Sequence, residues 1–566
     1  MTRVSETRVS ETRVSDTPSG DQVRALLERS GFGARLEPDP AQSRALAEGR
    51  AALEDLPRER SVYGVTHGFG PLVDHRADAA PGPQGIGLVH HLAVGQGEPL
   101  SPEVTRTMVW LRLRGMLLGH SAVSPEIWTA LAQQWNAGFT PVVPREGSLS
   151  ASGDLVPLAH AALAAAAPPG DRAERPPGAP GTEPGAGADV PVPGDSPFIR
   201  ASGARAWRRG AQGWEQMPAG AALAAHGLAP VHWEARSALA FVNGSSACLA
   251  SALHNHRELT ALARAAAGTT ARLASLLGAS AEAYDDALSR VRNQPGQRTA
   301  ARWIRAGLTA RPLPDGPGGG PARPLQERYS LRCAPQIVGA VLDQLEAQGA
   351  VLLDEAAGCS DNPVFVDGRL LHGGNFHAAP VALVCDSHGS SLHQLAFLLE
   401  RQLALVVDPA VNGGLPPLLA PRPGAGSGLA GVQIAASSHL ARIRQLAHPA
   451  SLTALPTNLH NQDHVPMALN GANAVSDMLS RAWWILGSLL VALNQAGHLL
   501  APGTGGQEPR PGLWGLLAHR FPALDRDRPL AAEVVSAAAL GRRHFLGDTG
   551  DGGTRAAADD AAGAGA

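Results

Sequence analysis

Two of the three tyrosines lie in segments that carry further groups able to do chemistry. Tyr63 begins the Gly-rich stretch YGVTHGFGPL, and Tyr329 precedes Arg332 by three residues in QERYSLRCAP. That spacing places Tyr329 and Arg332 on one face of a helix. A tyrosine with a lowered pKa can transfer protons, and an arginine can bind a carboxylate through two parallel hydrogen bonds. The pair suits a substrate with a carboxylate, although an ordinary helix start with a surface arginine explains the same residues.

Neutral amide side chains gather in several short loops between apolar segments. Any one of these loops alone is explained as a turn or a cap, because Asn and Gly are common there. Together they favour a site that binds a zwitterion and hydrogen-bonds a neutral aromatic substituent. The candidates are Asn243 in FVNGSS, Asn362 in CSDNPVF, Asn375 in HGGNFHAAP, and Asn458, Asn461 and Gln462 in PTNLHNQDHV.

A third candidate is the tripeptide Ala151-Ser152-Gly153 within GSLSASGDLVPLAH. The same tripeptide recurs at 201–203, and the chain has 65 glycines, so the three residues alone carry little information. A serine nucleophile at Ser152 lacks the G-x-S-x-G elbow. The meaning of the tripeptide therefore depends on its surroundings.

Composition excludes several classes of function. All 47 basic residues are arginine, so no lysine can hold pyridoxal phosphate, form a Schiff base or complete a Walker A loop. The net charge of −3 does not suit nucleic-acid binding. His460 and His464 have the i, i+4 spacing of a zinc helix but lack its glutamate, and His372 and His377 have no third ligand at a diagnostic spacing. We expect no metal.

The four cysteines show no C-x-x-C spacing and no secretory segment precedes them, which predicts a reduced, cytoplasmic setting. Residues 482–501 form an uncharged stretch long enough to span a membrane. Asn494, Gln495 and His498 interrupt it, so a buried bundle helix is favoured over a membrane span.

Long apolar runs with helical spacing predict a mainly α protein built on a long helix bundle. The predicted helices cover 101–119, 334–352, 379–407, 430–446 and 465–501. The predicted organisation is a repeat-containing disordered tail at 1–20, an N-terminal domain at 21–228 with a Pro/Gly-rich insertion at 165–194, a central helical-bundle domain at 229–546 and a disordered tail at 547–566.

Taken together, the motifs resemble the aromatic amino acid ammonia-lyase family, which includes histidine, phenylalanine and tyrosine ammonia-lyases and related aminomutases. The resemblance runs from about 61 to 501 and rests on many motifs in family order. It implies a homotetramer whose N-terminal lobe carries the tripeptide. The matching segments are YGVTHGFG, HLAVGQGEPL, GSLSASGDLVPLAH, FVNGSS, YSLRCAPQIVGA, SDNPVF, GGNFH, NGGLP and NQDHV.

In this family the Ala-Ser-Gly turn cyclises to 4-methylideneimidazol-5-one, or MIO. The resemblance implies that the Gly153 nitrogen attacks the Ala151 carbonyl, along a path that a residue without Cβ leaves open. Ser152 then loses its hydroxyl as water. The resulting electrophile takes the place of a pyridoxal electron sink, so neither a metal nor pyridoxal phosphate is expected.

The resemblance also assigns roles to the other candidates. Tyr63 is the base that removes the β-proton, and Asn243 hydrogen-bonds near the MIO and the amine. Tyr329 transfers protons or positions the amine, and Arg332 pairs with the carboxylate, assisted by Asn362. The loops of Tyr63 and Tyr329 come from neighbouring subunits. Asn458, Asn461 and Gln462 are predicted to line the amino-acid binding site.

Substrate choice rests on His91-Leu92, which aligns with the family's selectivity pair. Histidine lyases resemble Ser-His there and carry Glu at the position of Gln462, whereas phenylalanine lyases tend to have Phe-Leu. His-Leu resembles the tyrosine-selective form, which predicts L-tyrosine converted to p-coumarate and ammonia. A tyrosine 2,3-aminomutase, a histidine ammonia-lyase and a non-catalytic scaffold of the same fold remain alternatives. His91 is explained equally well as a capped or core histidine unrelated to the substrate.

Overall fold

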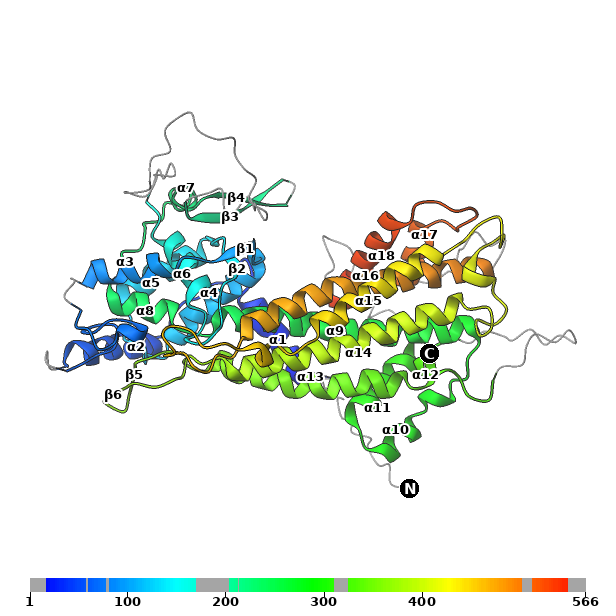
Figure 1. The fold of residues 1–566 in the computed structure, drawn as a ribbon, viewed down its shortest axis with the longest axis horizontal. Helices are drawn as coiled ribbons and strands as arrows, with labels where there is room; N and C mark the ends of the chain where they lie inside the picture. The colour runs from blue at the N-terminus through cyan, green and yellow to red at the C-terminus, as the bar shows by residue number, and fades with distance from the viewer. Residues whose placement is uncertain are drawn as a thin grey trace, which may run out of the picture.

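A computed structural model describes residues 17–56, 60–77, 81–168, 203–211, 213–309, 324–500 and 512–547. The described chain is mainly helical, as predicted. It forms a lobe of short helices joined end-on to a bundle of long ones, with the lobe on the left of Figure 1. The predicted tails and insertion lie outside the described residues except at their edges. Residues 18–20 do not belong to a tail, because Pro18–Arg29 forms helix α1. Of the predicted insertion, residues 165–168 are described.

The bundle is built on four helices that run lengthwise in Figure 1: α9 (Ser246–Leu277), α13 (Ala334–Ala357), α14 (Ala379–Val407) and α16 (Ala468–Leu500). They are rich in Ala and Leu, and many of their residues are buried. Helices that are apolar on nearly every side have to be surrounded by other helices, which is why they assemble here. Helix α15 (Ala430–Leu446) packs beside α14 and α16.

The predicted helices are confirmed, two of them to the residue. The runs 379–407 and 430–446 coincide with α14 and α15. The run 465–501 contains α16, which begins three residues later than predicted. Inside the bundle the Gln495 side chain exchanges two hydrogen bonds with the backbone of Leu524, 2.8 and 3.1 Å long. None of the helices within the described residues is long and apolar enough to cross a membrane.

Besides the short helix α7 (Ala219–Ala225), the lobe contains six helices and three short antiparallel strand pairs among its described residues. Its helices are α2 (Pro40–Glu54), α3 (Pro81–Leu92), α4 (Pro102–Met116), α5 (Pro125–Asn136), α6 (Leu155–Ala165) and α8 (Ala235–Val242). The strand pairs are β1 (Gln96–Pro99) with β2 (Pro144–Glu146), β3 (Arg205–Gly210) with β4 (Gly213–Pro218), and β5 (Val364–Val366) with β6 (Arg369–Leu371).

Shorter elements complete the described chain. They are α7 (Ala219–Ala225), α10 (Asp286–Arg292), α11 (Pro295–Gly307), α12 (Tyr329–Arg332), α17 (Leu513–Arg520), α18 (Ala531–Leu546) and the 3-10 turns η1 (Gly70–Leu72), η2 (Glu282–Tyr284), η3 (Pro417–Leu419) and η4 (Ala450–Thr453). One apolar core fills the bundle and a second fills the lobe and the bundle end that adjoins it.

Candidate active site

The tripeptide lies between β2 and α6, in a turn whose backbone doubles back on itself. Ala151 and Gly153 form an isolated bridge across Ser152. Gly153 has a φ of +65°, and a Cβ there would lie 2.3 Å from the backbone of Gly244. Only glycine fits this position. The two residues that ring closure must join are therefore already turned toward each other, and the turn fits the MIO precursor.

Asp154 anchors this turn through three hydrogen bonds. Its buried carboxylate accepts hydrogen bonds from the hydroxyls of Ser148 (3.0 Å) and Ser150 (2.7 Å) and from the backbone N–H of Cys248 at the start of α9 (2.7 Å). Burial raises the pKa of Asp154, and these donors oppose the rise. The Ser150 hydroxyl oxygen in turn accepts the backbone N–H of Leu469 (3.0 Å), which joins the turn to α16.

Tyr63 belongs to the lobe and lies in the loop before η1. Its backbone N–H donates to His372 Nε2 (3.2 Å), and its phenol oxygen accepts the backbone N–H of Gly70 (2.9 Å). Burial raises the pKa of Tyr63, while the Gly70 N–H lowers it by a smaller amount. In the isolated chain this phenol is therefore a proton donor, and it needs added positive charge nearby to act as a base.

Asn243 and Asn362 come together beside the turn. Asn243 follows α8, directly before the Gly244 backbone that touches Gly153. Its amide nitrogen donates to the backbone oxygen of Asn362 (3.0 Å) and to Asp361 Oδ1 (3.3 Å). The Asn362 amide oxygen accepts the backbone N–H of Gly373 (2.7 Å), which ties it to the GGNF loop. Both asparagines are buried.

Of the three predicted side chains in the 457–462 turn, one reaches the tripeptide. Gln462 donates from Nε2 to the Ser152 hydroxyl oxygen at 3.0 Å. Asn458 and Asn461 are exposed, and the hydrogen bond between them joins their backbones (3.0 Å). The structure thus brings Gln462 into the site and leaves the contact of Asn458 and Asn461 with substrate as a prediction.

His91 and Leu92 end α3, and the chain that follows them packs against residues on either side of the tripeptide segment. The chain continues to Gly95, where an added Cβ would lie 3.0 Å from Val156 and 3.2 Å from the backbone oxygen of Glu146. The His91 ring nitrogen Nδ1 lies 3.1 Å from the backbone oxygen of Gly87. A carbonyl only accepts, so Nδ1 carries the proton and Nε2 of the neutral ring is an acceptor.

Tyr329 and Arg332 lie at the opposite end of the bundle. They form α12, and the Arg332 guanidinium lies 4.7 Å from the centre of the Tyr329 ring, which confirms the shared face. Helix α13, with 24 residues, follows directly and ends before Asp361. Such a helix is about 36 Å long, so one chain cannot bring both ends to one small substrate (Figure 1).

A cavity of about 680 Å³ adjoins α12 and is lined by Tyr329, Arg332 and residues around 409–414. Tyr329 is 68% exposed, and Arg332 Nε is buried without a hydrogen-bond partner among the described residues. The candidate site is therefore present as two halves, one in the lobe and one at α12.

Sequence reasoning missed the buried arginines and the carboxylate that support the lobe half. Arg236 and Arg112 surround Asp361, with Nη2–Oδ2 distances of 2.5 and 3.7 Å. Asp361 had a signal, because it directly precedes Asn362 in the SDNP motif. The arginines had none, since nothing in their local sequence distinguishes a buried arginine from a surface one.

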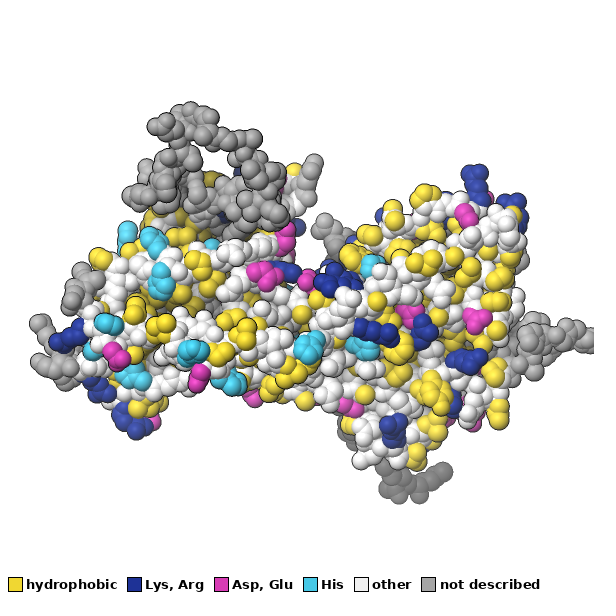
Figure 2. Space-filling model, in the orientation of Figure 1, with side chains coloured by type: hydrophobic (Ala, Val, Ile, Leu, Met, Phe, Trp, Pro, Cys, Tyr) yellow, Lys and Arg dark blue, Asp and Glu magenta, His cyan; other side chains and the backbone are white. Residues whose placement is uncertain are grey.

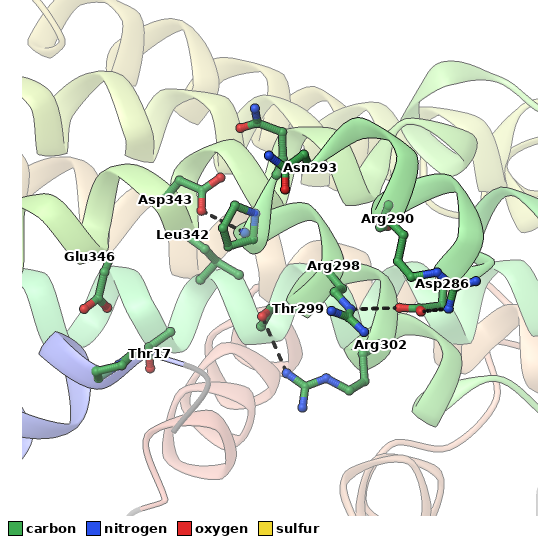
Figure 3. A pocket seen from close by; sticks show the side chains of 15 residues that line it. Thr17, Asp286, Arg290, Asn293, Arg298, Thr299, Arg302, Leu342, Asp343 and Glu346 are labelled. Atoms are coloured by element: carbon green, nitrogen blue, oxygen red, sulfur yellow. Dashed lines mark hydrogen bonds and ion pairs between the residues drawn. The ribbon is translucent and has the colours of Figure 1, made fainter. Parts of the chain in front are cut away.

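A second cavity, of about 890 Å³, lies between α10, α11, α13 and the start of α1 (Figure 3). Its carboxylates already have structural partners: Asp286 pairs with Arg290 (2.7 Å), Asp343 accepts the Gly296 N–H of α11 (2.7 Å), and Glu346 accepts the Ser19 hydroxyl of α1 (3.0 Å). Within the part of the chain that the structure describes, no three His, Cys, Asp or Glu side chains are grouped to hold a metal.

Known proteins resemble this chain over most of its length. The family model for aromatic amino acid lyases matches residues 19–510. The chain is 35% identical to a histidine ammonia-lyase of Aromatoleum aromaticum, over 89% of this chain and 88% of that protein, and 32% identical to one of Rhodospirillum rubrum, over 90% and 91%.

Solved structures show the same fold. The tyrosine aminomutase of Streptomyces globisporus is 29% identical, with a TM-score of 0.78 over 93% of this chain and 96% of that one. The phenylalanine aminomutase of Pantoea agglomerans is 23% identical, with a TM-score of 0.77 over 91% and 96%. The chain therefore belongs to the aromatic amino acid lyase family and is a carbon–nitrogen lyase.

Proposed function

We propose that this chain is a tyrosine ammonia-lyase that converts L-tyrosine to p-coumarate and ammonia. The observation that carries the substrate assignment is His91, whose Nδ1 is engaged by Gly87 and whose Nε2 is left as an acceptor. A phenol O–H is the matching donor. The neutral amide of Gln462 beside Ser152 supports the same choice, because histidine lyases carry Glu at the position of Gln462. A site built to bind a hydroxyl discriminates against substrates without one.

The turn geometry supports an MIO formed from Ala151, Ser152 and Gly153. When formed, this group supplies an electrophile that makes the amino nitrogen a better leaving group. Tyr63, as the phenolate, would take the β-proton on its oxygen, the atom that accepts the Gly70 N–H, and so become the neutral phenol. Because burial raises the pKa of Tyr63, the loss of its own proton needs positive charge nearby. The bound substrate or Arg332 of the partner subunit would supply that charge.

The second half of the site supports a homo-oligomer, and we propose a homotetramer. Tyr329 and Arg332 of the partner subunit would bind the amine and the carboxylate. The outer faces of α14 and α15 carry large exposed apolar side chains, with Leu383 65% and Ile434 71% exposed. Surfaces of this kind favour association between subunits. Figure 2 shows histidines over the lobe and the adjoining part of the bundle.

Two other activities have support of their own. The Streptomyces globisporus structure is a tyrosine aminomutase, and an aminomutase on the same site would return ammonia to the β-carbon. The two sequence relatives described above are histidine ammonia-lyases. Both activities need the same turn, so product and substrate decide between them.

The test is to incubate the purified protein with tyrosine, histidine and phenylalanine in parallel. Acrylate formation is followed by absorbance and β-amino acids by chromatography. We expect p-coumarate to form fastest and without prior β-tyrosine. Faster turnover of histidine would overturn the substrate assignment, and β-tyrosine that accumulates before coumarate would establish the aminomutase.

A further inference from the structure

The Asn243 amide has a single favourable orientation. Its nitrogen faces two acceptors, Asp361 Oδ1 at 3.3 Å and the Asn362 backbone oxygen at 3.0 Å. Rotation of the amide by half a turn would bring its oxygen against these same two oxygens, which only accept. The amide oxygen receives no hydrogen bond from the described residues. It is also not fully buried, since it is absent from the fully buried polar atoms without a partner. The oxygen is therefore the end of the Asn243 amide that is left to accept a hydrogen bond.

Two buried arginines hold the acceptor in place. Arg236, whose side chain is fully buried, donates to Asp361 Oδ2 at 2.5 Å and also to the backbone oxygens of Ser121 (2.7 Å) and Pro363 (3.1 Å). Arg112 lies 3.7 Å from the same carboxylate oxygen and donates to the Ala240 backbone in α8 (2.7 Å). A buried carboxylate with these partners has no alternative position, because any rotation would leave buried charges unpaired.

We infer that Asp361, clamped by Arg236 and Arg112, is a positioning residue that turns the amide oxygen of Asn243 toward the amino group of the substrate. The inference rests on the proposed function and deepens it. An ammonium group and a departing ammonia both present N–H donors, so an oxygen binds them where an NH₂ group would repel them. Asn243 stands beside Gly244, whose backbone oxygen accepts the Asp154 N–H at 2.7 Å, so Asn243 is next to the turn that carries the tripeptide.

The test uses Asp361→Asn, Asn243→Asp and the double variant in the full-length protein. Asp361→Asn offers an N–H to Asn243 and lets its amide reverse, while Asn243→Asp places two carboxylates together. We expect each single change to lower kcat by up to about 10²-fold, with a smaller change in KM because Arg332 of the partner subunit binds the carboxylate. The double variant returns one carboxylate and one amide to the pair. The amide at position 361 can turn its oxygen to Arg236 and its nitrogen to the carboxylate at position 243, whose other oxygen faces the amine, so the double variant should recover part of kcat.

Intact mass supplies the readout that is independent of turnover, because cyclisation removes two waters. A matched control is Asn255→Asp, a buried amide in α9 that donates to the Ala472 backbone (2.8 Å) outside the site, and it should keep its kcat. An Asp361→Asn variant with the two-water loss and unchanged kcat would overturn the clamp. If that single variant does not cyclise, rescue by the double variant supports the clamp and failure of the double variant to recover overturns it. Wild-type protein without the two-water loss would refute the proposed function itself.

Discussion

The two halves of the site differ in how far one chain prepares them. In the lobe, Asn243, Asp154 and Asp361 are buried, and each is held by hydrogen bonds to neighbours, which include Arg236 of α8 and Cys248 of α9. At α12, Tyr329 is 68% exposed and contacts Arg332 through its ring. In the proposed function, the lobe holds a tight turn for a reaction of its own backbone, whereas the α12 half binds the amine and the carboxylate of the substrate. The proposal therefore makes the rigid half complete within one chain and the binding half dependent on assembly.

The largest expected effect comes from breaking the rigid half. Ser152→Ala removes the hydroxyl that leaves as water, so we expect a mass without the two-water loss and no measurable turnover, with the fold retained. Intact-mass measurement and circular dichroism check both. The matched control is Ser202→Ala in the second Ala-Ser-Gly, which should leave mass loss and turnover unchanged; an active Ser152→Ala protein would contradict the cyclised turn.

Hybrid oligomers of two variants, each defective in a different half of the site, test whether each site combines residues from two subunits. Arg332→Gln keeps a polar side chain but loses the charge that pairs with the carboxylate, and we expect kcat/KM to fall by about 10²-fold or more. Co-expression of this variant with Ser152→Ala should restore part of the activity, because some hybrid sites combine an intact turn with an intact arginine. No recovery in hybrids shown by mass to contain both chains would argue that each site is built within one chain.

A smaller effect is expected at the substrate ring. His91→Phe removes the acceptor Nε2 and adds an apolar surface, which should shift the ratio of kcat/KM from tyrosine toward phenylalanine by about 10-fold or more. Parallel steady-state assays with both amino acids measure the ratio. Leu92→Met keeps an apolar side chain of similar size and should move the ratio little. An unchanged ratio in His91→Phe would remove this residue as the phenol contact.

The bundle contributes a pH effect on stability. Burial lowers the pKa of His256 to about 4. The unfolded chain takes up this proton near pH ~6.5, and the folded chain does so only near the lowered pKa, so stability is lost as the pH falls through that window. The loss is about 3 kcal/mol for this group. Denaturant unfolding at about pH 7 and about pH 5 should show a smaller difference for His256→Gln than for wild type or for the exposed control His460→Gln.

Much of the fold was predictable because burial on all sides leaves a pattern in the residues themselves. The weakly charged apolar runs 379–407 and 430–446 match the bounds of α14 and α15. Helix α9 was not predicted as a run, although it has 32 residues, because Asn255, His256 and other polar residues interrupt its apolar pattern. Those side chains are accommodated by partners on α14 and α16, such as the His388 ring nitrogen 3.2 Å from His256.

By itself the sequence determined the chemistry that this chain can attempt: no lysine, an Ala-Ser-Gly turn whose third residue must be glycine, and a tyrosine and arginine three residues apart. These properties belong to residue types and short spacings. Only the tertiary structure decided which of the candidates meet. It placed Gln462 against Ser152, ordered the Asn243 amide through Asp361 and two buried arginines, and put α12 at the far end of α13. The physical reason is that burial and pairing of polar groups depend on neighbours hundreds of residues away, which no local pattern records.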